Sequence, residues 1–156
     1  MRLIFKQRIF SWLDSYDIFD EYGNVVYTVE GKLSFGRRLH INDAAGNHIA
    51  TLKRRVIALL PTFEMYLGEK YVGAIRKELT LLRPAFYIDC NGWQIDGNFF
   101  EWDYEIKDDD VTVATLQKKI MNWADTYVLD VGEAYDAVTV LMVALAIDAE
   151  KDDRNY

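Results

Sequence analysis

The chain has 156 residues, a net charge of −7, 14% aromatic residues and only two prolines. This length suits one domain with a substantial core, and the aromatic-rich, proline-poor composition excludes a disordered chain. The single cysteine, Cys90, excludes an intramolecular disulfide and a zinc site built from several thiolates, and it fits a reducing cytoplasm.

Charge is distributed unevenly along the sequence. Residues 1–78 contain 12 Lys+Arg against 9 Asp+Glu, whereas residues 79–156 contain 6 against 16. Nucleic-acid affinity comes mainly from neutralised phosphates, so we expect no nucleic-acid partner for this acidic protein. A local basic face in the first half remains open, beside the plainer interpretation of an ordinary solvated surface. The N-terminus M-R-L-I-F-K-Q-R-I-F lacks the features of a signal peptide, which predicts a cytoplasmic protein.

From its start, the chain shows the period-two pattern of β-strands. Short turns with glycines at 23, 46, 68 and 92 separate pairs of β-rich runs, and this regular spacing indicates repeated hairpins. The expected hairpins pair 18–19 with 25–29, 39–41 with 48–52, 63–67 with 71–75, and 86–89 with 93–95. The first two turns share the sequence D-x-x-G-N, in which Gly and Asn tolerate positive φ. Return strands at Lys32–Phe35 and Leu79–Arg83 would complete a meander.

A fifth hairpin is expected from Trp102–Ile106, a turn at Asp108–Asp110, and Val111–Leu116. Its first strand alternates, which directs Asp103 and Glu105 to one face and the apolar residues inward. A further strand, 125–131, precedes the C-terminal segment.

The C-terminal segment Ala134–Asp148 is the most apolar stretch, and within 137–147 Thr139 alone is not an apolar residue. A helix that is apolar on all sides is either buried or in a membrane, and this run is shorter than the roughly twenty residues that span a bilayer. Asp136 suits the positive N-terminal end of such a helix. Asp148, near the other end, needs a basic partner or access to solvent.

Two arrangements could accommodate this helix. A β-sandwich with the helix docked outside would leave one apolar face in water, whereas a sheet closed around it buries every face and removes the sheet edges. We therefore expect a mainly β (β+α) fold, a closed antiparallel barrel of about twelve strands around a central C-terminal hydrophobic helix. The expected boundaries are one domain at 1–150, with the helix at about 133–149, and a flexible charged tail at 151–156.

By these residues the chain resembles the LURP-one-related family. The similarity rests on Ile95–Asn98, Tyr104–Ile106, Val113–Lys119, Asp125–Asp130, the helix ending Ala146–Asp148, Tyr27–Lys32 and the D-x-x-G-N turns. It implies the tubby C-terminal-like fold, a barrel of about twelve strands threaded by a hydrophobic helix, which phospholipid scramblases share. Tubby domains bind phosphoinositide headgroups through external Lys and Arg. Their motif has no residue-by-residue match here, so that activity is an analogy of fold.

Four basic clusters are the candidate ligand-binding residues: Arg37 and Arg38; Lys53, Arg54 and Arg55; Arg76 and Lys77; Lys118 and Lys119. Neighbours on a strand point to opposite faces, so each pair directs one charge outward unless it lies at a barrel rim. Gathered at one rim, the clusters would form a patch for anionic lipid, whereas dispersed clusters would only guard strand ends against edge pairing.

We therefore expect a non-enzymatic binding or scaffold module that binds anionic phospholipid or phosphoinositide headgroups, peripheral to a membrane. The alternative is a protein-interaction or structural module without a small ligand. The partner is then an anionic membrane surface or another protein, and the sequence leaves the oligomeric state open.

Metal and catalytic sites are not expected. His40 and His48 flank the second turn, with Asp43 as a third potential ligand, but their spacing carries no metal-binding signature. The turn 108–110 lacks the glycine and the distal glutamate of a calcium loop.

The residues that could take part in catalysis also have simpler structural explanations. The acids Asp89 and Asp96 disfavour a thiolate at Cys90, and Asp103 with Glu105 fits the solvent face of a strand better than an acid–base pair. No nucleotide-binding or nucleophile motif occurs, so we expect no cofactor and no enzyme.

Overall fold

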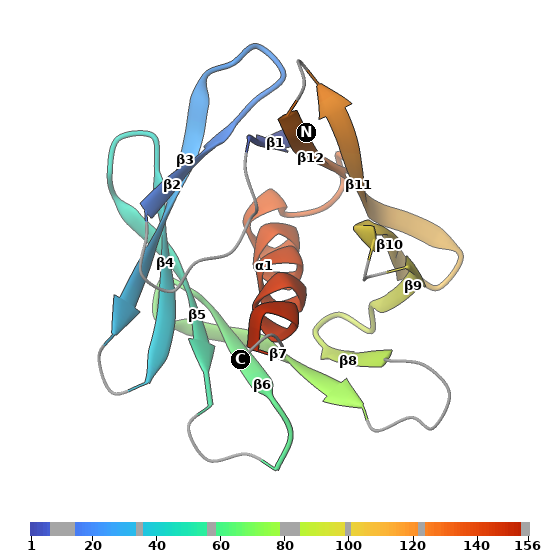
Figure 1. Ribbon diagram of the computed structural model, residues 1–156. Coiled ribbons are helices and arrows are strands. Elements are labelled where there is room, and N and C mark those ends of the chain that lie inside the picture. Colours follow the sequence, from blue (N-terminus) through green and yellow to red (C-terminus); the bar gives the residue numbers. More distant parts are fainter. Residues whose placement is uncertain are drawn as a thin grey trace.

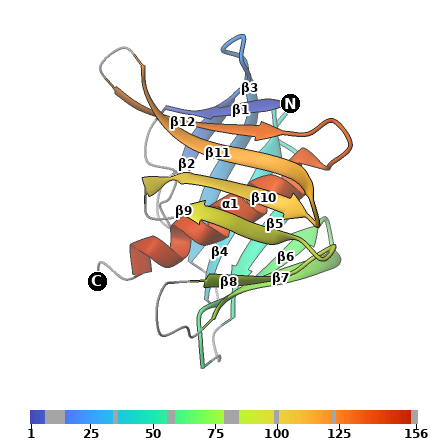
Figure 2. The same cartoon turned by 90° about the vertical axis from the view of Figure 1, so that its right-hand side faces the viewer.

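The computed structural model describes residues 1–6, 15–33, 36–55, 59–78, 85–98, 101–121 and 124–153. One antiparallel sheet of twelve strands wraps around one helix, as expected (Figures 1 and 2). The elements are β1 Arg2–Phe5, β2 Ser15–Phe19, β3 Val25–Leu33, β4 Arg37–Asp43, β5 His48–Arg54, β6 Thr62–Leu67, β7 Lys70–Glu78, β8 Ala85–Asp89, β9 Gln94–Asn98, β10 Asp103–Asp108, β11 Val111–Met121, β12 Ala124–Val131 and α1 Ala137–Asp153.

The strands follow the order β8-β7-β6-β5-β4-β3-β2-β1-β12-β11-β10-β9. Consecutive strands pair throughout except β8 with β9. β1 lies between β2 and β12 and thereby joins the two halves of the wall. The expected return strand at Lys32–Phe35 is wrong as a separate element, because β3 continues through Leu33. The other one, Leu79–Arg83, lies outside the described residues.

The expected hairpin 86–89/93–95 is wrong. Both strands form, but β8 and β9 are the two ends of the sheet, so the barrel has a seam between them. The turn itself closes, with the Trp93 N–H donating to the Cys90 carbonyl (3.1 Å). Trp93 is then buried edge-on against Tyr135, with ring centroids 5.8 Å apart. Because this large side chain is buried in the core, Trp93 does not form the pairing with β8 that the sequence suggested.

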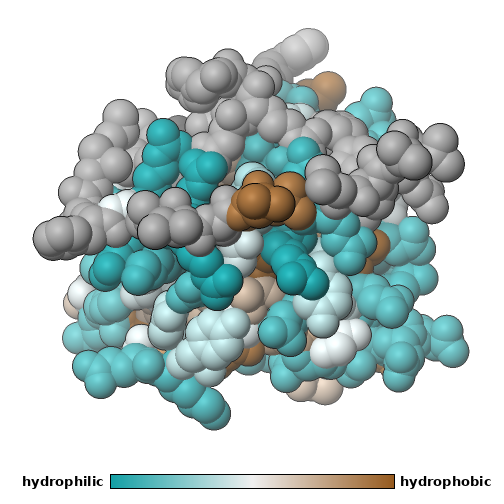
Figure 3. Space-filling model, turned by 90° about the horizontal axis from the view of Figure 1, so that it is seen from below, coloured by the Kyte–Doolittle hydropathy of each residue, from teal (hydrophilic) through white to brown (hydrophobic). Residues whose placement is uncertain are grey.

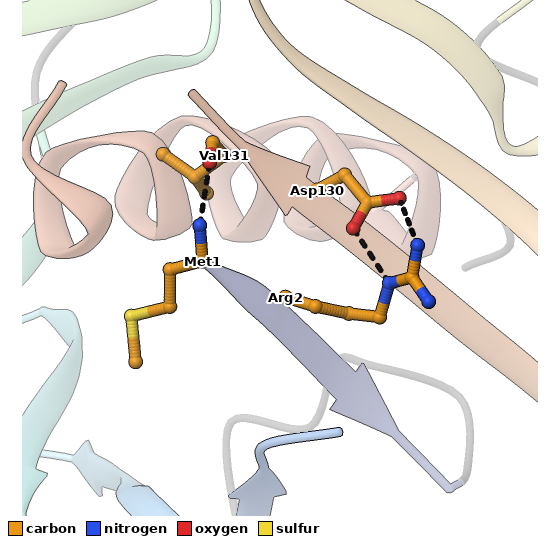
Figure 4. A network of polar contacts seen from close by, with 4 residues as sticks. All are labelled: Met1, Arg2, Asp130 and Val131. Carbon is orange, nitrogen blue, oxygen red and sulfur yellow. Dashed lines mark hydrogen bonds and ion pairs between the residues drawn. The ribbon is translucent and has the colours of Figure 1, made fainter. Parts of the chain in front are cut away.

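The N-terminal strand closes the wall against β12 (Figure 4). The Met1 amino group donates to the Val131 carbonyl (2.7 Å), and the Val131 N–H donates back to the Met1 carbonyl (2.8 Å). Arg2 adds a two-point contact to Asp130, at 2.7 and 3.3 Å. No strand was predicted for this segment, because its partner β12 is distant in the sequence.

The two D-x-x-G-N turns have the same hydrogen bonds. Oδ1 of Asp20 accepts the backbone N–H groups of Tyr22 (2.9 Å) and Asn24 (2.8 Å), and Oδ2 accepts the Asn24 side chain (3.0 Å). Asp43 and Asn47 repeat the last two contacts at the same distances. The glycines of the two turns have φ of 86° and 87°. The asparagine side chain above all, then the backbone N–H groups, lower the pKa of both aspartates.

The helix α1 is the core of the molecule. Every side chain from Val138 to Lys151 is buried. Asp136 caps the N-terminus, where its Oδ2 accepts the Thr139 N–H (2.8 Å) and hydroxyl (2.6 Å). The helix occupies Ala137–Asp153 rather than the expected 133–149, because this cap sets its start and its last turn continues into the expected tail. Residues 154–156 lie outside the described part.

None of the described helices is both long and apolar enough to cross a bilayer.

Substitutions in α1 test its place in the core. Leu145→Ala is expected to lower the free energy of unfolding by about 2–5 kcal/mol, since a fully buried leucine leaves a cavity. Val143→Asp should yield no folded protein, because the buried carboxylate would have no partner. The control Val111→Ala, at an exposed site, should change stability by less than about 0.5 kcal/mol. Urea unfolding measures all three, and a folded, wild-type-like Val143→Asp protein would contradict the buried helix.

Candidate functional site

The four basic clusters lie at the same end of the barrel, which we call the mouth. Antiparallel pairing places the start of β4 beside the end of β5, and the start of β6 beside the ends of β5 and β7. β11 reaches this end on the opposite side of the wall. Two contacts show that α1 ends there too: Lys77 Nζ lies 3.2 Å from Glu150 Oε1, and Lys151 Nζ lies 3.9 Å above the Trp102 ring. In Figure 2 this end of α1 emerges on the left.

The opposite end, where α1 begins, is acidic, and we call it the turn end. It collects the tight turns between consecutive strands and the link from β12 to α1. Its charged residues include Asp20, Glu21, Asp43, Glu69, Asp108, Asp109, Asp110, Glu133 and Asp136. All four basic clusters are therefore at the mouth, where they lie among acids such as Glu64, Asp125 and Glu150, whereas the turn end carries mainly acids.

Strand alternation divides the basic residues of the mouth into two sets. Arg37 shares a strand face with buried Leu39, and Arg54 shares one with buried Leu52, so both lie on the inner side of the wall. By the same alternation, the inner set is Arg37, Arg54, Lys77 and Lys118, and the outer set is Arg38, Lys53, Arg55, Arg76 and Lys119.

Part of the inner set neutralises buried or neighbouring acids. Glu150, which is 2% exposed, is paired with Lys77 where α1 ends. A buried carboxylate needs such a partner, and a cation also suits the negative end of the helix dipole. Lys118 pairs with Asp125 at 3.0 Å, and this hydrogen bond raises the pKa of the Lys118 ammonium. These two lysines therefore have a structural role at the mouth.

Three arginines of the mouth share one concavity of about 390 Å³ between β4, β5 and β6. It is lined by Gly36, Arg37, Arg54, Arg55, Leu59, Leu60 and Pro61. We call it the arginine pocket. Its lining combines three arginines, residues that suit phosphate or carboxylate oxygens, with an apolar side.

Lys118 and Lys119 line a second concavity of about 350 Å³ with Glu101, Trp102, Asp103 and Gln117. The structure thus brings all nine predicted residues to one end but not into one site. Arg38, Lys53, Arg76 and Lys77 line neither concavity. Arg76 instead lies over the Tyr87 ring at 4.6 Å.

The partner of Asp148 is Trp102, which the sequence analysis did not single out for this role. The indole Nε1 donates to Asp148 Oδ1 at 2.9 Å, and Trp102 has a positive φ of 52°. Burial, and secondarily the Asp148 carboxylate, raises the pKa of the Tyr16 and Tyr104 hydroxyls. A polar cluster therefore lies inside the mouth. In the sequence, the only sign of this polar cluster was the charge of Asp148 within an apolar helix.

The two histidines stack against each other. The His40 and His48 rings stack with centroids 4.3 Å apart, and His48 Nε2 lies 2.8 Å from Thr51 Oγ1. Asp43 is occupied by its own turn. Within the described ranges, no group of three His, Cys, Asp or Glu residues could hold a metal ion.

The catalytic candidates lie apart from one another. Cys90 is buried at the seam, where burial and the neighbouring Asp89 raise the pKa of its thiol. Asp103 and Glu105 lie on the outer face of β10, with Tyr104 buried between them, as the alternation predicted. Glu105 accepts a hydrogen bond from Thr112 (3.0 Å).

The family model for LURP-one-related proteins matches residues 1–148. The chain belongs to the LURP-one-related family. It is 28% identical over 149 residues to the uncharacterized protein YxjI of Bacillus subtilis (strain 168), a match that covers 95% of this chain and 92% of YxjI. The X-ray structure of an Arabidopsis thaliana protein has the same fold, with a TM-score of 0.60 and 14% identity over 99% of this chain and 91% of that one. These relatives establish the family and the fold.

The stacked histidines predict a pH-dependent stability. Burial, then the neighbouring His48, lowers the pKa of His40 below its ordinary value of 6.5, so the unfolded chain binds more protons in this range. The free energy of unfolding should therefore fall as the pH drops below 6.5 and through the folded-state pKa. His40→Gln should reduce this fall, as measured by urea unfolding at about pH 7.5 and about pH 5.5. Equal pH dependence in both proteins would contradict this role.

Proposed function

We propose that this protein is a non-enzymatic module that binds anionic phospholipid headgroups through the basic residues of the mouth. The observation that supports it most is that all four basic clusters lie at the mouth, whereas the turn end carries mainly acids. A molecule with a net charge of −7 is repelled by an anionic surface as a whole. This distribution of charge lets it approach with the mouth forward.

The expected strength of this interaction follows from the number of unengaged cations. Each Lys or Arg near an anionic membrane contributes about 1 kcal/mol at low salt. Lys53 and Lys119 belong to the outer set on opposite sides of the mouth, and Lys119 is exposed. They are suited to contact a surface rather than the acids of α1.

The interior of the barrel supports a binding role over a catalytic one. Leu141, Met142 and Leu145 are fully buried and fill the space inside the strands with the rest of α1. An enzyme site usually needs a pocket with converging polar groups, and the polar cluster around Asp148 is itself buried against Trp102.

The seam favours a second candidate function, a protein-interaction module. β8 and β9 are the edge strands of the sheet, each paired on one side only. Such edges can pair with an extended peptide. Binding to a peptide needs no anionic lipid, so one assay of vesicle binding distinguishes the two candidate functions.

Vesicle sedimentation tests the lipid proposal. The wild-type protein should sediment with phosphatidylcholine vesicles that contain phosphatidylserine, should not sediment with pure phosphatidylcholine, and should dissociate at high salt. The double variant Lys53→Gln/Lys119→Gln should bind about 30-fold more weakly, since two contributions of about 1 kcal/mol are lost.

The matched control is Lys70→Gln, which removes one exposed lysine at the turn end and should leave binding unchanged. Sedimentation that does not depend on phosphatidylserine at low salt would reject the proposal and favour the protein-interaction module. An equal loss in Lys70→Gln would reject the mouth as the binding surface.

A further inference from the structure

The side chain of Leu59 is fully exposed, at 100%, more than any other large hydrophobic residue of the described chain. Transfer of a leucine from water to an apolar environment is favourable, so a fully exposed one stands out beside a charged cluster. Figure 3 shows the molecule from below, with a surface that is mostly hydrophilic and a few hydrophobic groups, the most prominent near the centre.

The backbone around Leu59 is tied to the sheet. The Leu60 carbonyl accepts the Thr62 hydroxyl (3.1 Å), and the Pro61 carbonyl accepts the Lys77 N–H (3.3 Å). The Arg55 N–H donates to the Thr62 carbonyl at 2.9 Å, which extends the pairing of β5 with β6. Because these bonds anchor the residues that follow, Leu59 projects from a supported position at the mouth.

Leu59, Leu60 and Pro61 form one side of the arginine pocket. Its volume of about 390 Å³ falls within the range of roughly 300–1,000 Å³ that is usual for small-ligand sites. Arg55 is oriented there by Glu64, whose Oε1 accepts from Nε at 2.9 Å. Glu64 is held in turn by the Tyr66 hydroxyl (2.6 Å), a bond that, ahead of the one from Arg55, lowers the pKa of Glu64.

This contact engages Nε of Arg55, whose side chain is 49% exposed. A guanidinium pre-oriented through Nε can still offer N–H donors to phosphate oxygens.

The charge around each exposed apolar residue decides which partner it fits. Tyr22 (82% exposed) and Val111 (56%) belong to the turn end, beside Asp20, Glu21 and Asp110, where an anionic surface is repelled. Leu59 lies beside arginines instead. An apolar side chain bordered by cations matches a layer of acyl chains below anionic headgroups.

We propose that the segment 59–61 is an apolar anchor, in which Leu59 inserts into the bilayer while the arginine pocket receives the phosphate of an anionic lipid headgroup. The inference rests on the proposed function and adds a defined insertion point and headgroup subsite to it. Binding then has two components, one sensitive to salt from the arginines and one resistant to salt from Leu59.

Site-specific fluorescence tests the insertion. Leu59→Cys and Val111→Cys are each labelled with an environment-sensitive dye, and wild-type protein, whose Cys90 is buried, controls for stray labelling. Phosphatidylserine-containing vesicles should shift the emission of the label at position 59 to shorter wavelength and leave the label at position 111 unchanged. Vesicles that sediment the protein without a shift at position 59 would overturn the anchor while the proposed function stands.

Substitutions separate the two components. Leu59→Ser should weaken vesicle binding about tenfold with an unchanged salt dependence, whereas Arg55→Gln should weaken it and reduce the salt dependence. Soluble glycerol phosphate should compete with vesicles for wild type and Leu59→Ser alike, since the pocket is intact in both.

Competition by glycerol phosphate that is equal for wild type and Arg55→Gln would overturn the headgroup subsite. Failure of wild-type protein to sediment with anionic vesicles would instead remove the proposed function and this inference together.

Discussion

A helix that is apolar around its whole circumference has one stable environment in a water-exposed protein, an enclosure that covers every side. Val140 to Ala146 are fully buried, so no face of α1 is left to solvent over these residues. The sheet must therefore curve until its two halves meet. The short strand β1 joins them through β12, and Trp93 is buried in the turn between β8 and β9, the two strands of the remaining seam.

The meander then sorts the surface charge along the barrel axis. In an antiparallel sheet, every second connection lies at the same end, so the tight turns gather at one end and the other connections at the opposite end. The turns use aspartate for their hydrogen bonds, which makes the turn end acidic. The basic clusters occur at the alternate strand ends and therefore meet at the mouth. A distribution of charge that could orient the protein on a charged partner follows from the topology.

Residues of the mouth also provide partners for buried charges of the core. α1 ends there with buried Asp148 and Glu150, whose charges would be costly in an apolar core without partners. Trp102 and Lys77 provide those contacts. Lys77 and Lys118 of the inner set thus pair with acids at the mouth, whereas the arginine pocket and the outer set face a potential ligand. A substitution at Lys77 would affect both the stability of the helix end and ligand binding. Substitutions at Lys53 and Lys119 would affect ligand binding alone.

Features that depend on neighbours in the chain were evident from the residues. The aspartate and asparagine of each D-x-x-G-N turn form hydrogen bonds within that turn, and Asp136 caps the helix through Thr139, three residues away. The apolar segment that begins at Ala137 must be buried in any fold. Partners distant in the chain were not evident. β1 pairs with β12, and Trp93 packs against Tyr135 in the core instead of pairing with β8. Trp102 donates to Asp148, and Arg37, Arg54 and Leu59 line one pocket. Each of these depends on packing between segments that are far apart in the chain, and local hydrogen bonds and hydrophobic periodicity carry no information about such contacts.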